Sequence, residues 1–291
     1  MKKSIILVLI FAVGYSKSYA QLTPKGDVPT LEEMTVIFEK MMESIKNVKT
    51  AKYRLIKNER YNGKIVQSEQ IVKQQVPLTK IYMKILKGPN NGAEVLYVKG
   101  ANGGNAFVNA SSFLPTLSLD PLGSLVNEKQ RHTMFQLGFA YPGDLINDAY
   151  NRYKHKAGEY STYGGIIKWD NRDVYKITLD NKEYKIKDYT VLAGEDLVKI
   201  ARKLKLDEYN LLELNPSISS YTSVKAGQVI KIPETFTKSV IMYVDTKNFL
   251  PVYQKMTDLN GMVGEYEYHD LIVNPVIPDE EFTKGFKGYS F

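Results

Sequence analysis

The sequence predicts an α+β protein with one large antiparallel sheet and a few helices, interrupted by a small strand–helix–helix–strand unit. Apolar side chains recur at helical spacing after Thr30 and Glu33, which form a capping box at a helix start. From about Tyr53 the hydrophobic period changes to two, and Asn62-Gly63 is a strong hairpin signal. The strand pattern returns after the small unit. We therefore expect residues 188–233 to be an insertion in one sheet domain rather than a link between two domains.

The first 20 residues have the three parts of a secretory signal peptide. Lys2 and Lys3 form the charged start, residues 5–13 are an almost unbroken apolar run, and Ser18-Tyr19-Ala20 places small residues three apart before Gln21. The apolar run is short for a hydrocarbon core of about 30 Å, and no later stretch approaches about 18 apolar residues. We expect an exported protein with no transmembrane segment once this leader is removed.

The host domain is predicted over residues 30–187 and 234–291, after a flexible polar lead-in at residues 21–29. Residues 122–156 are expected to be largely helical, and Pro142 fits a helix start. Strands are predicted from period-two patterns at residues 53–61, 65–73, 81–86, 94–98, 106–108, 166–169, 174–179, 239–244, 252–257 and 262–269.

Composition excludes several classes of site. Cysteine is absent, so the chain has no disulfide, no thiolate metal ligand, no cysteine nucleophile and no cysteine for a lipid anchor. The formal net charge of +7 includes three lysines of the expected leader. No run of basic residues interleaved with aromatic ones suggests a nucleic-acid groove. We expect no nucleic-acid partner, no bound metal and no cofactor.

The sequence contains few residue patterns that indicate an enzyme. The three histidines, His132, His155 and His269, are scattered and lack metal-ligand spacing. Arg131-His132-Thr133 is the most site-like cluster outside the insertion, although a structural role for His132 is the simpler interpretation. Glu265 and Glu267 could serve glycoside cleavage, but a pair two apart on a strand is more typical of a solvated sheet face. We predict a protein that is not an enzyme and keep a wall-remodelling glycosidase as an alternative.

The insertion has a distinctive motif pattern. Leu197, Ile200, Ala201 and Leu204 form the apolar face of one helix, and Asp207 can cap the next. Its characteristic residues are Tyr189-Thr190-Val191, Gly194-Glu195-Asp196-Leu197, Ile200-Ala201, Leu211, Leu214-Asn215-Pro216 and Gly227-Gln228-Val229-Ile230-Lys231-Ile232-Pro233. At this spacing the unit resembles a LysM domain over its whole length, and the βααβ fold of that family is implied.

LysM domains bind N-acetylglucosamine (GlcNAc) polymers such as peptidoglycan and chitin, in a groove between the loop after the first strand and the loop after the second helix. The resemblance implies that Leu197 and Ile218 contact the sugar methyl group, while backbone groups at the helix ends pair with acetamido groups. Alternatively, Gly194 and Asn215 serve turn and helix-end geometry. Glu195 and Asp196 stand where the family commonly has Asp followed by Thr or Ser. The implied glycan-binding residues are Gly194, Glu195, Asp196, Leu197, Asn215, Pro216, Ser217 and Ile218.

The host domain carries weaker resemblances. Residues 245–252, 264–271 and 274–282 look like the final hairpin of periplasmic lipoprotein-carrier (LolA-like) proteins, and residues 53–133 resemble an exported bacterial family of unknown function. The first likeness implies a curved half-barrel sheet with helices on its concave side around an apolar cavity. Alternation shows only which face is buried, so a filled core is the alternative. The candidate cavity residues are Tyr53, Leu55, Ile81, Met83, Val95 and Tyr97.

Together these features predict a non-catalytic cell-envelope protein. The LysM unit would bind peptidoglycan or a related GlcNAc polymer, and the host domain would take an apolar ligand or a partner. A competing interpretation is a periplasmic lipid or lipoprotein carrier whose LysM unit is vestigial. The LolA-like resemblance implies the periplasm as the location, and secretion is the alternative.

Overall fold

A computed structural model describes residues 31–291 except 112, 128 and 129. The predicted leader, the lead-in and the cap at Thr30 lie outside these residues. The helices are α1 (Leu31–Asn47), α2 (Ser124–Asn127), α3 (Ala140–Tyr153), α4 (Ala157–Tyr160), α5 (Leu197–Leu204) and α6 (Glu208–Leu214). Short 3₁₀ turns occur at Asn102–Gly104, Met134–Gln136, Lys154–Lys156 and Asp279–Phe282.

The strands form one large sheet and one small one. The large sheet has eleven antiparallel strands in the order β6-β5-β4-β3-β2-β1-β13-β12-β11-β8-β7, and β9 pairs with β10 separately. Their bounds are β1 (Thr50–Tyr61), β2 (Lys64–Gln75), β3 (Lys80–Lys87), β4 (Glu94–Val98), β5 (Ala106–Asn109), β6 (Leu117–Leu119), β7 (Ser161–Trp169), β8 (Arg172–Asp180), β9 (Ile186–Thr190), β10 (Val229–Pro233), β11 (Ser239–Asp245), β12 (Pro251–Asp258) and β13 (Gly261–Val273).

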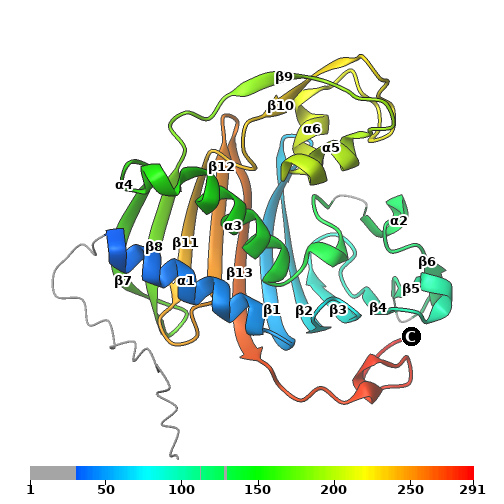
Figure 1. Cartoon of the computed structure of the whole chain (residues 1–291). Coiled ribbons are helices and arrows are strands. Elements are labelled where there is room, and N and C mark those ends of the chain that lie inside the picture. Colours follow the sequence, from blue (N-terminus) through cyan, green and yellow to red (C-terminus); the bar gives the residue numbers. More distant parts are fainter. Residues whose placement is uncertain (1–30, 112, 128–129) are drawn as a thin grey trace, which may run out of the picture.

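The large sheet curves around α1 and α3, which lie across its concave face (Figure 1). The buried stripe of α1, including Ile37 and Met41, packs against inward side chains of β1 such as Tyr53. Phe38 stacks on Tyr150 of α3 with 3.8 Å between ring centroids. The predicted fold class, an α+β curved antiparallel sheet with helices on the concave side, is confirmed.

The middle of the chain is less helical than expected. Helix α3 begins at Ala140, so Pro142 lies in its first turn, where a missing N–H is harmless. Residues 130–133, however, form an irregular segment between α2 and the turn at Met134–Gln136. The prediction of a largely helical stretch is therefore wrong for residues 130–133.

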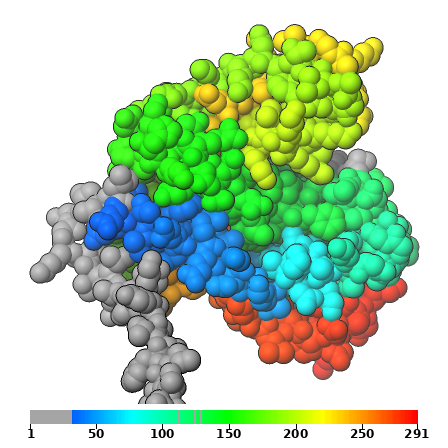
Figure 2. All heavy atoms as spheres, in the orientation of Figure 1, coloured from blue at the N-terminus to red at the C-terminus, as the bar shows by residue number. Residues whose placement is uncertain are grey.

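The small unit leaves and rejoins the large sheet between two neighbouring strands. Strand β8 precedes it, β11 follows it, and these two pair directly, with Asp180 opposite Ser239. Inside the unit, α5 and α6 pack on the β9–β10 ribbon around a separate apolar core. Figure 2 shows it as the yellow-green lobe at the top of the view. This is the predicted βααβ arrangement; the exact domain boundaries stay a prediction.

Residues 274–291 cover part of the opposite, convex face. Tyr82 and Leu96 point away from the concave side, because neighbouring strand residues alternate. Tyr289 stacks on Tyr82 at 3.8 Å between centroids, and Phe282 is buried beside them. The C-terminal segment thus closes apolar surface at this end of the sheet. Within the residues the structure describes, no helix is both long and apolar enough to cross a membrane.

Candidate functional site

An open cavity of about 370 Å³ lies between the concave face of the sheet and the segment that runs from β6 into α3. Its walls are mainly apolar and come from β2, β3, β4, α3 and β12. Representative lining residues are Val66, Met83, Val95, Leu137, Ile146 and Met256. A cavity of this size accommodates a small apolar or amphipathic molecule.

The six residues expected to line a cavity divide into two groups. Leu55, Met83 and Val95 line the open space. Tyr53, Ile81 and Tyr97 belong to the adjoining packed core, where Phe139 lies 6.4 Å from Tyr53 and Phe135 lies 5.0 Å from Tyr97, between ring centroids. The concave face of the sheet thus has both a filled core and an open cavity. Aromatic rings from residues 134–139 fill one part and leave the other part open.

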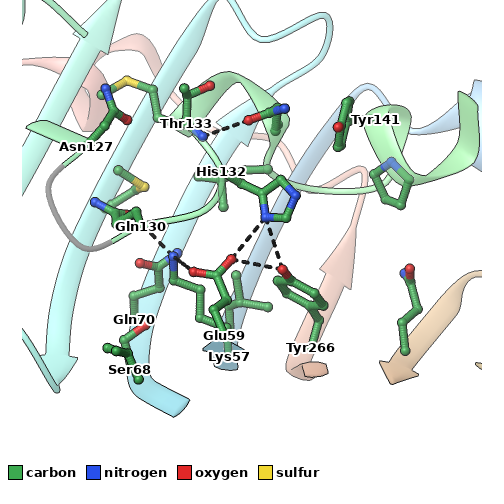
Figure 3. Close-up of a pocket in the computed structure, with 18 of the residues that line it drawn as sticks. Lys57, Glu59, Ser68, Gln70, Asn127, Gln130, His132, Thr133, Tyr141 and Tyr266 are labelled. Carbon is green, nitrogen blue, oxygen red and sulfur yellow. Dashed lines mark hydrogen bonds and ion pairs between the residues drawn. The ribbon is translucent and has the colours of Figure 1, made fainter. Parts of the chain in front are cut away.

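The cavity has one polar wall, which Figure 3 shows in close-up. Glu59 is 3% exposed, and its Oε2 accepts a bond of 3.1 Å from Lys57 Nζ. Its Oε1 accepts a bond of 2.8 Å from the Tyr266 hydroxyl and lies 3.0 Å from His132 Nδ1. Gln130 Oε1 accepts from Lys57 Nζ at 3.2 Å. The buried carboxylate and ammonium thus satisfy each other inside a largely apolar space.

The contacts within this wall shift the pKa values of Glu59 and Tyr266 in opposite directions. Burial alone would raise the pKa of the Glu59 carboxyl, but the Lys57 charge and the contacts with His132 and Tyr266 outweigh it and lower that pKa below its usual range. Burial, with the nearby Glu59 charge, raises the pKa of Tyr266 well above its usual value. Glu59 therefore stays ionised and Tyr266 stays a hydrogen-bond donor at neutral pH.

The low pKa of Glu59 predicts a stability effect that depends on pH. A depressed native pKa stabilises the fold above the unfolded-state pKa of about 4.3, and this contribution is lost as the pH falls below that value. We expect Glu59→Gln to lower the free energy of unfolding by roughly 2 kcal/mol at neutral pH. The deficit should shrink on acidification towards pH of about 3, as measured by urea unfolding. The exposed Glu43→Gln should show no such trend, and a deficit for Glu59→Gln that does not change with pH would contradict the assignment.

Lys57 and Glu59 were missed as site residues, although the sequence contains a signal for them. They continue the alternation of Tyr53 and Leu55, and every second residue of β1 from Ala51 to Glu59 is buried. Charged residues on an inward strand face indicate a polar site. His132, by contrast, belongs to Arg131-His132-Thr133, the cluster that stands out in the sequence as the most site-like outside the insertion.

Arg131, the neighbour of His132, joins the host sheet to the inserted unit. Its fully buried side chain donates to Asp207 Oδ2 at 2.8 Å and to Glu213 Oε2 at 3.0 Å. Arg60 also binds Glu213, at 3.1 Å, and Asp258 of the host, at 2.6 Å. These ions have little access to water, and they connect α6 of the inserted unit to the end of the β1–β2 hairpin.

The residues implied as a glycan groove play different parts in the structure. Leu197 is fully buried and Ile218 is 7% exposed, and both belong to the core of the inserted unit. Asn215 is also inside, where its amide donates to the Leu211 and Lys231 carbonyls and its oxygen accepts from Lys231 N–H. The expectation that Leu197 and Ile218 touch a sugar methyl group is therefore corrected, because core packing occupies their side chains.

The remaining implied residues lie at the surface of the two loops. Gly194, Pro216 and Ser217 are exposed. The loops adjoin each other, since the Leu197 N–H donates to the Tyr221 carbonyl at 2.9 Å. A groove here would present backbone groups to a ligand; the individual contacts stay a prediction.

Glu195 and Asp196 stabilise the first loop. Asp196 caps α5 by accepting from the Lys199 N–H at 2.8 Å. Glu195 accepts from Lys203 Nζ at 2.9 Å and from the Tyr189 hydroxyl at 2.8 Å. The Lys203 bond and a bond from the Leu192 N–H lower the pKa of Glu195 to about 2. Both carboxylates are therefore engaged in contacts within the module.

The other candidate catalytic groups do not converge. Glu265 accepts from the Tyr253 hydroxyl at 2.6 Å, and Glu267 Oε2 lies 3.0 Å from His269 Nε2. His155 is an exposed residue beside α3. Among the residues placed by the structure, no group of three or more His, Asp or Glu side chains could hold a metal ion. Glu265 and Glu267 share a sheet face, and each is tied to its neighbours there.

Two family models match this chain. Residues 48–190 match a protein family of unknown function (DUF1571), and residues 189–233 match the LysM domain. A curated relative, the endolysin of Bacillus phage B103, is 32% identical over 74 residues, which are 25% of this chain and 28% of the endolysin. The chain therefore carries a LysM domain, and it spans less than a third of the curated relative that it matches.

Several solved structures resemble the chain distantly. The MucA/MucB complex of Pseudomonas aeruginosa is 8% identical, with a TM-score of 0.38 and coverage of 87% of this chain and 61% of that one. A LolA superfamily protein from Nitrosomonas europaea is 12% identical, with a TM-score of 0.28 and coverage of 86% and 97%. The lipoprotein LppX of Mycobacterium tuberculosis is 12% identical, with a TM-score of 0.40 and coverage of 84% and 98%.

Proposed function

We propose that this chain is an exported, non-catalytic cell-envelope protein that binds peptidoglycan or a related GlcNAc polymer through residues 188–233. The observation that carries the proposal is the LysM match, combined with two adjoining loops whose surface is open to solvent. The signal-peptide pattern of the first 20 residues supports export, and we place the protein in the periplasm. Residues 30–187 and 234–291 would form the host domain that presents the module.

The geometry of the module supports this use. Arg131 and Arg60 join α6 to the host, and the loops at residues 192–197 and 215–220 both include exposed residues. A glycan strand could reach them without displacing the host. Because the side chains of Leu197 and Asn215 serve the fold, recognition would depend on loop backbone groups and on the shape of the loop surface.

Co-sedimentation with insoluble peptidoglycan tests the proposal. Ser217→Trp would place a bulky ring on the exposed second loop, and we expect it to weaken retention about tenfold, or roughly 1.4 kcal/mol. Lys187→Trp is the matched control, since Lys187 is exposed at the opposite end of β9. Equal retention of wild type, Ser217→Trp and a chain lacking residues 188–233 would refute glycan binding by the module.

The cavity supports a second role, the carriage of an apolar ligand by the host domain. Its wall is mainly apolar, and Leu117 and Leu125, which line it, are 48% and 72% exposed. Such residues at the opening suit the entry of a hydrocarbon chain. If the module proved unable to bind glycan, carriage of a lipid or lipoprotein would become the main function.

Native mass spectrometry of the purified chain tests this role. We expect co-purified lipid with the wild type and its loss in Val66→Trp, whose ring would fill part of the cavity. Ile65→Trp is the control, because Ile65 is the preceding residue of β2 and is 50% exposed on the other face. Equal lipid content in both variants would contradict carriage in this cavity.

A further inference from the structure

Four polar side chains lie on two neighbouring strands of the cavity wall. Lys57 and Glu59 come from β1, and Ser68 and Gln70 come from β2, with Lys57 directly opposite Ser68. All four line the cavity, and they are 7%, 3%, 8% and 2% exposed, respectively. Figure 3 shows them on one wall, facing the segment that carries Gln130 and His132. A purely apolar ligand would leave this wall unmatched, because buried polar groups need hydrogen-bond partners.

Among the described residues of this wall, the charges of Lys57 and Glu59 balance each other. Lys57 Nζ binds one oxygen of Glu59 at 3.1 Å, and Tyr266 and His132 engage the other. An anionic ligand group would approach the Glu59 carboxylate, and a cationic one would approach the Lys57 ammonium. In a space of low dielectric either approach costs energy, so the wall favours an uncharged group.

Ser68 provides the independent sign of a ligand. Its Oγ is buried, and among the residues that the structure describes it has no hydrogen-bond partner. Leaving a buried hydroxyl unpaired is unfavourable, and a ligand group that pairs with it would remove this cost. A ligand hydroxyl could accept a hydrogen bond from Ser68 or donate one to it.

We propose that this wall is a head-group site for an uncharged, hydroxyl-bearing amphiphile whose hydrocarbon chain lies along the apolar part of the cavity. The proposal rests on the proposed carriage of an apolar ligand and specifies its polar end. A site that hydrogen-bonds a hydroxyl discriminates strongly against analogues that lack one, because its own polar groups are then left unpaired.

Displacement of an apolar fluorescent dye, phenylnaphthylamine, from the full mature chain tests the proposal. The competitors are decanol, decanoate and decyltrimethylammonium, which share a chain length and differ in head-group charge. We expect decanol to displace the dye at the lowest concentration. Ser68→Ala should raise the inhibition constant of decanol, corrected for the dye affinity measured in the same variant, by about three- to tenfold. Val66→Ala is the control; it removes apolar contact and should weaken the dye and all three competitors together.

The outcomes separate this inference from the broader one. Dye binding with no effect of Ser68→Ala on decanol would overturn the head-group site while leaving apolar carriage intact. Displacement by decanoate at lower concentrations than decanol would overturn the assignment of an uncharged head group. Failure of the wild type to bind the dye would overturn both carriage and the head-group site.

Discussion

Replacing Arg131 with methionine should lower the free energy of unfolding by about 3–5 kcal/mol, because it leaves buried carboxylates without their cation. Asp207 is 1% exposed at its side chain and receives two of the guanidinium bonds. Glu213 would lose one of its two arginine partners. Equilibrium unfolding in urea, followed by tryptophan fluorescence and by circular dichroism, measures the loss.

Arg202→Met is the matched control for this prediction. Arg202 pairs with Glu208 at 3.1 Å, but its side chain is 64% exposed, so its removal should cost less than about 1 kcal/mol. If Arg131→Met cost no more than Arg202→Met, the buried ion cluster would not be what holds the LysM module on the host.

Replacing Lys57 with methionine should also cost about 3–5 kcal/mol at neutral pH. The side chains are similar in length, so the main change is the loss of the positive charge beside Glu59, which is 3% exposed. Adding Glu59→Gln to Lys57→Met should restore much of the stability, because the pair is then uncharged. Urea unfolding of the single and double variants gives the coupling between the two positions.

Lys168→Met provides the comparison for Lys57. Lys168 binds Asp173 at 2.8 Å with its side chain 76% exposed, and its loss should be nearly neutral. A double variant no more stable than Lys57→Met would show that the charge pair is not the source of the loss.

Local sequence patterns were enough to predict much of the fold. The period-two alternation of β1 fixed which side chains face α1, and Asn62-Gly63 marked the β1–β2 turn. The LysM module could be predicted because its sequence features are short-range. They are an apolar helical stripe, the Asp207 cap and the end of the second helix at Asn215-Pro216. These features depend on neighbours within one or two turns of chain.

Two features could not be predicted in the same way: the polar wall of the cavity, and the ion pairs that join the LysM module to the host domain. Arg131 and Asp207 are 76 positions apart, and nothing in either local pattern selects that partner. The open cavity exists because Phe135 and Phe139 fill one part of the concave face and not the next, which is a result of packing rather than of period. The same limit explains the misplaced roles of Leu197 and Ile218. Their positions within the motif were right, but motif spacing does not tell a core side chain from one that lines a groove.

Nuclear magnetic resonance mapping with a soluble GlcNAc oligomer tests the central claim most directly. Titration of the labelled chain, residues 21–291, should shift the backbone amides of residues 192–198 and 215–220, leaving the resonances of Lys57, Glu59 and other cavity residues in place. Amide shifts absent from both loops at millimolar oligomer, or confined to the host sheet, would contradict glycan recognition by the LysM module.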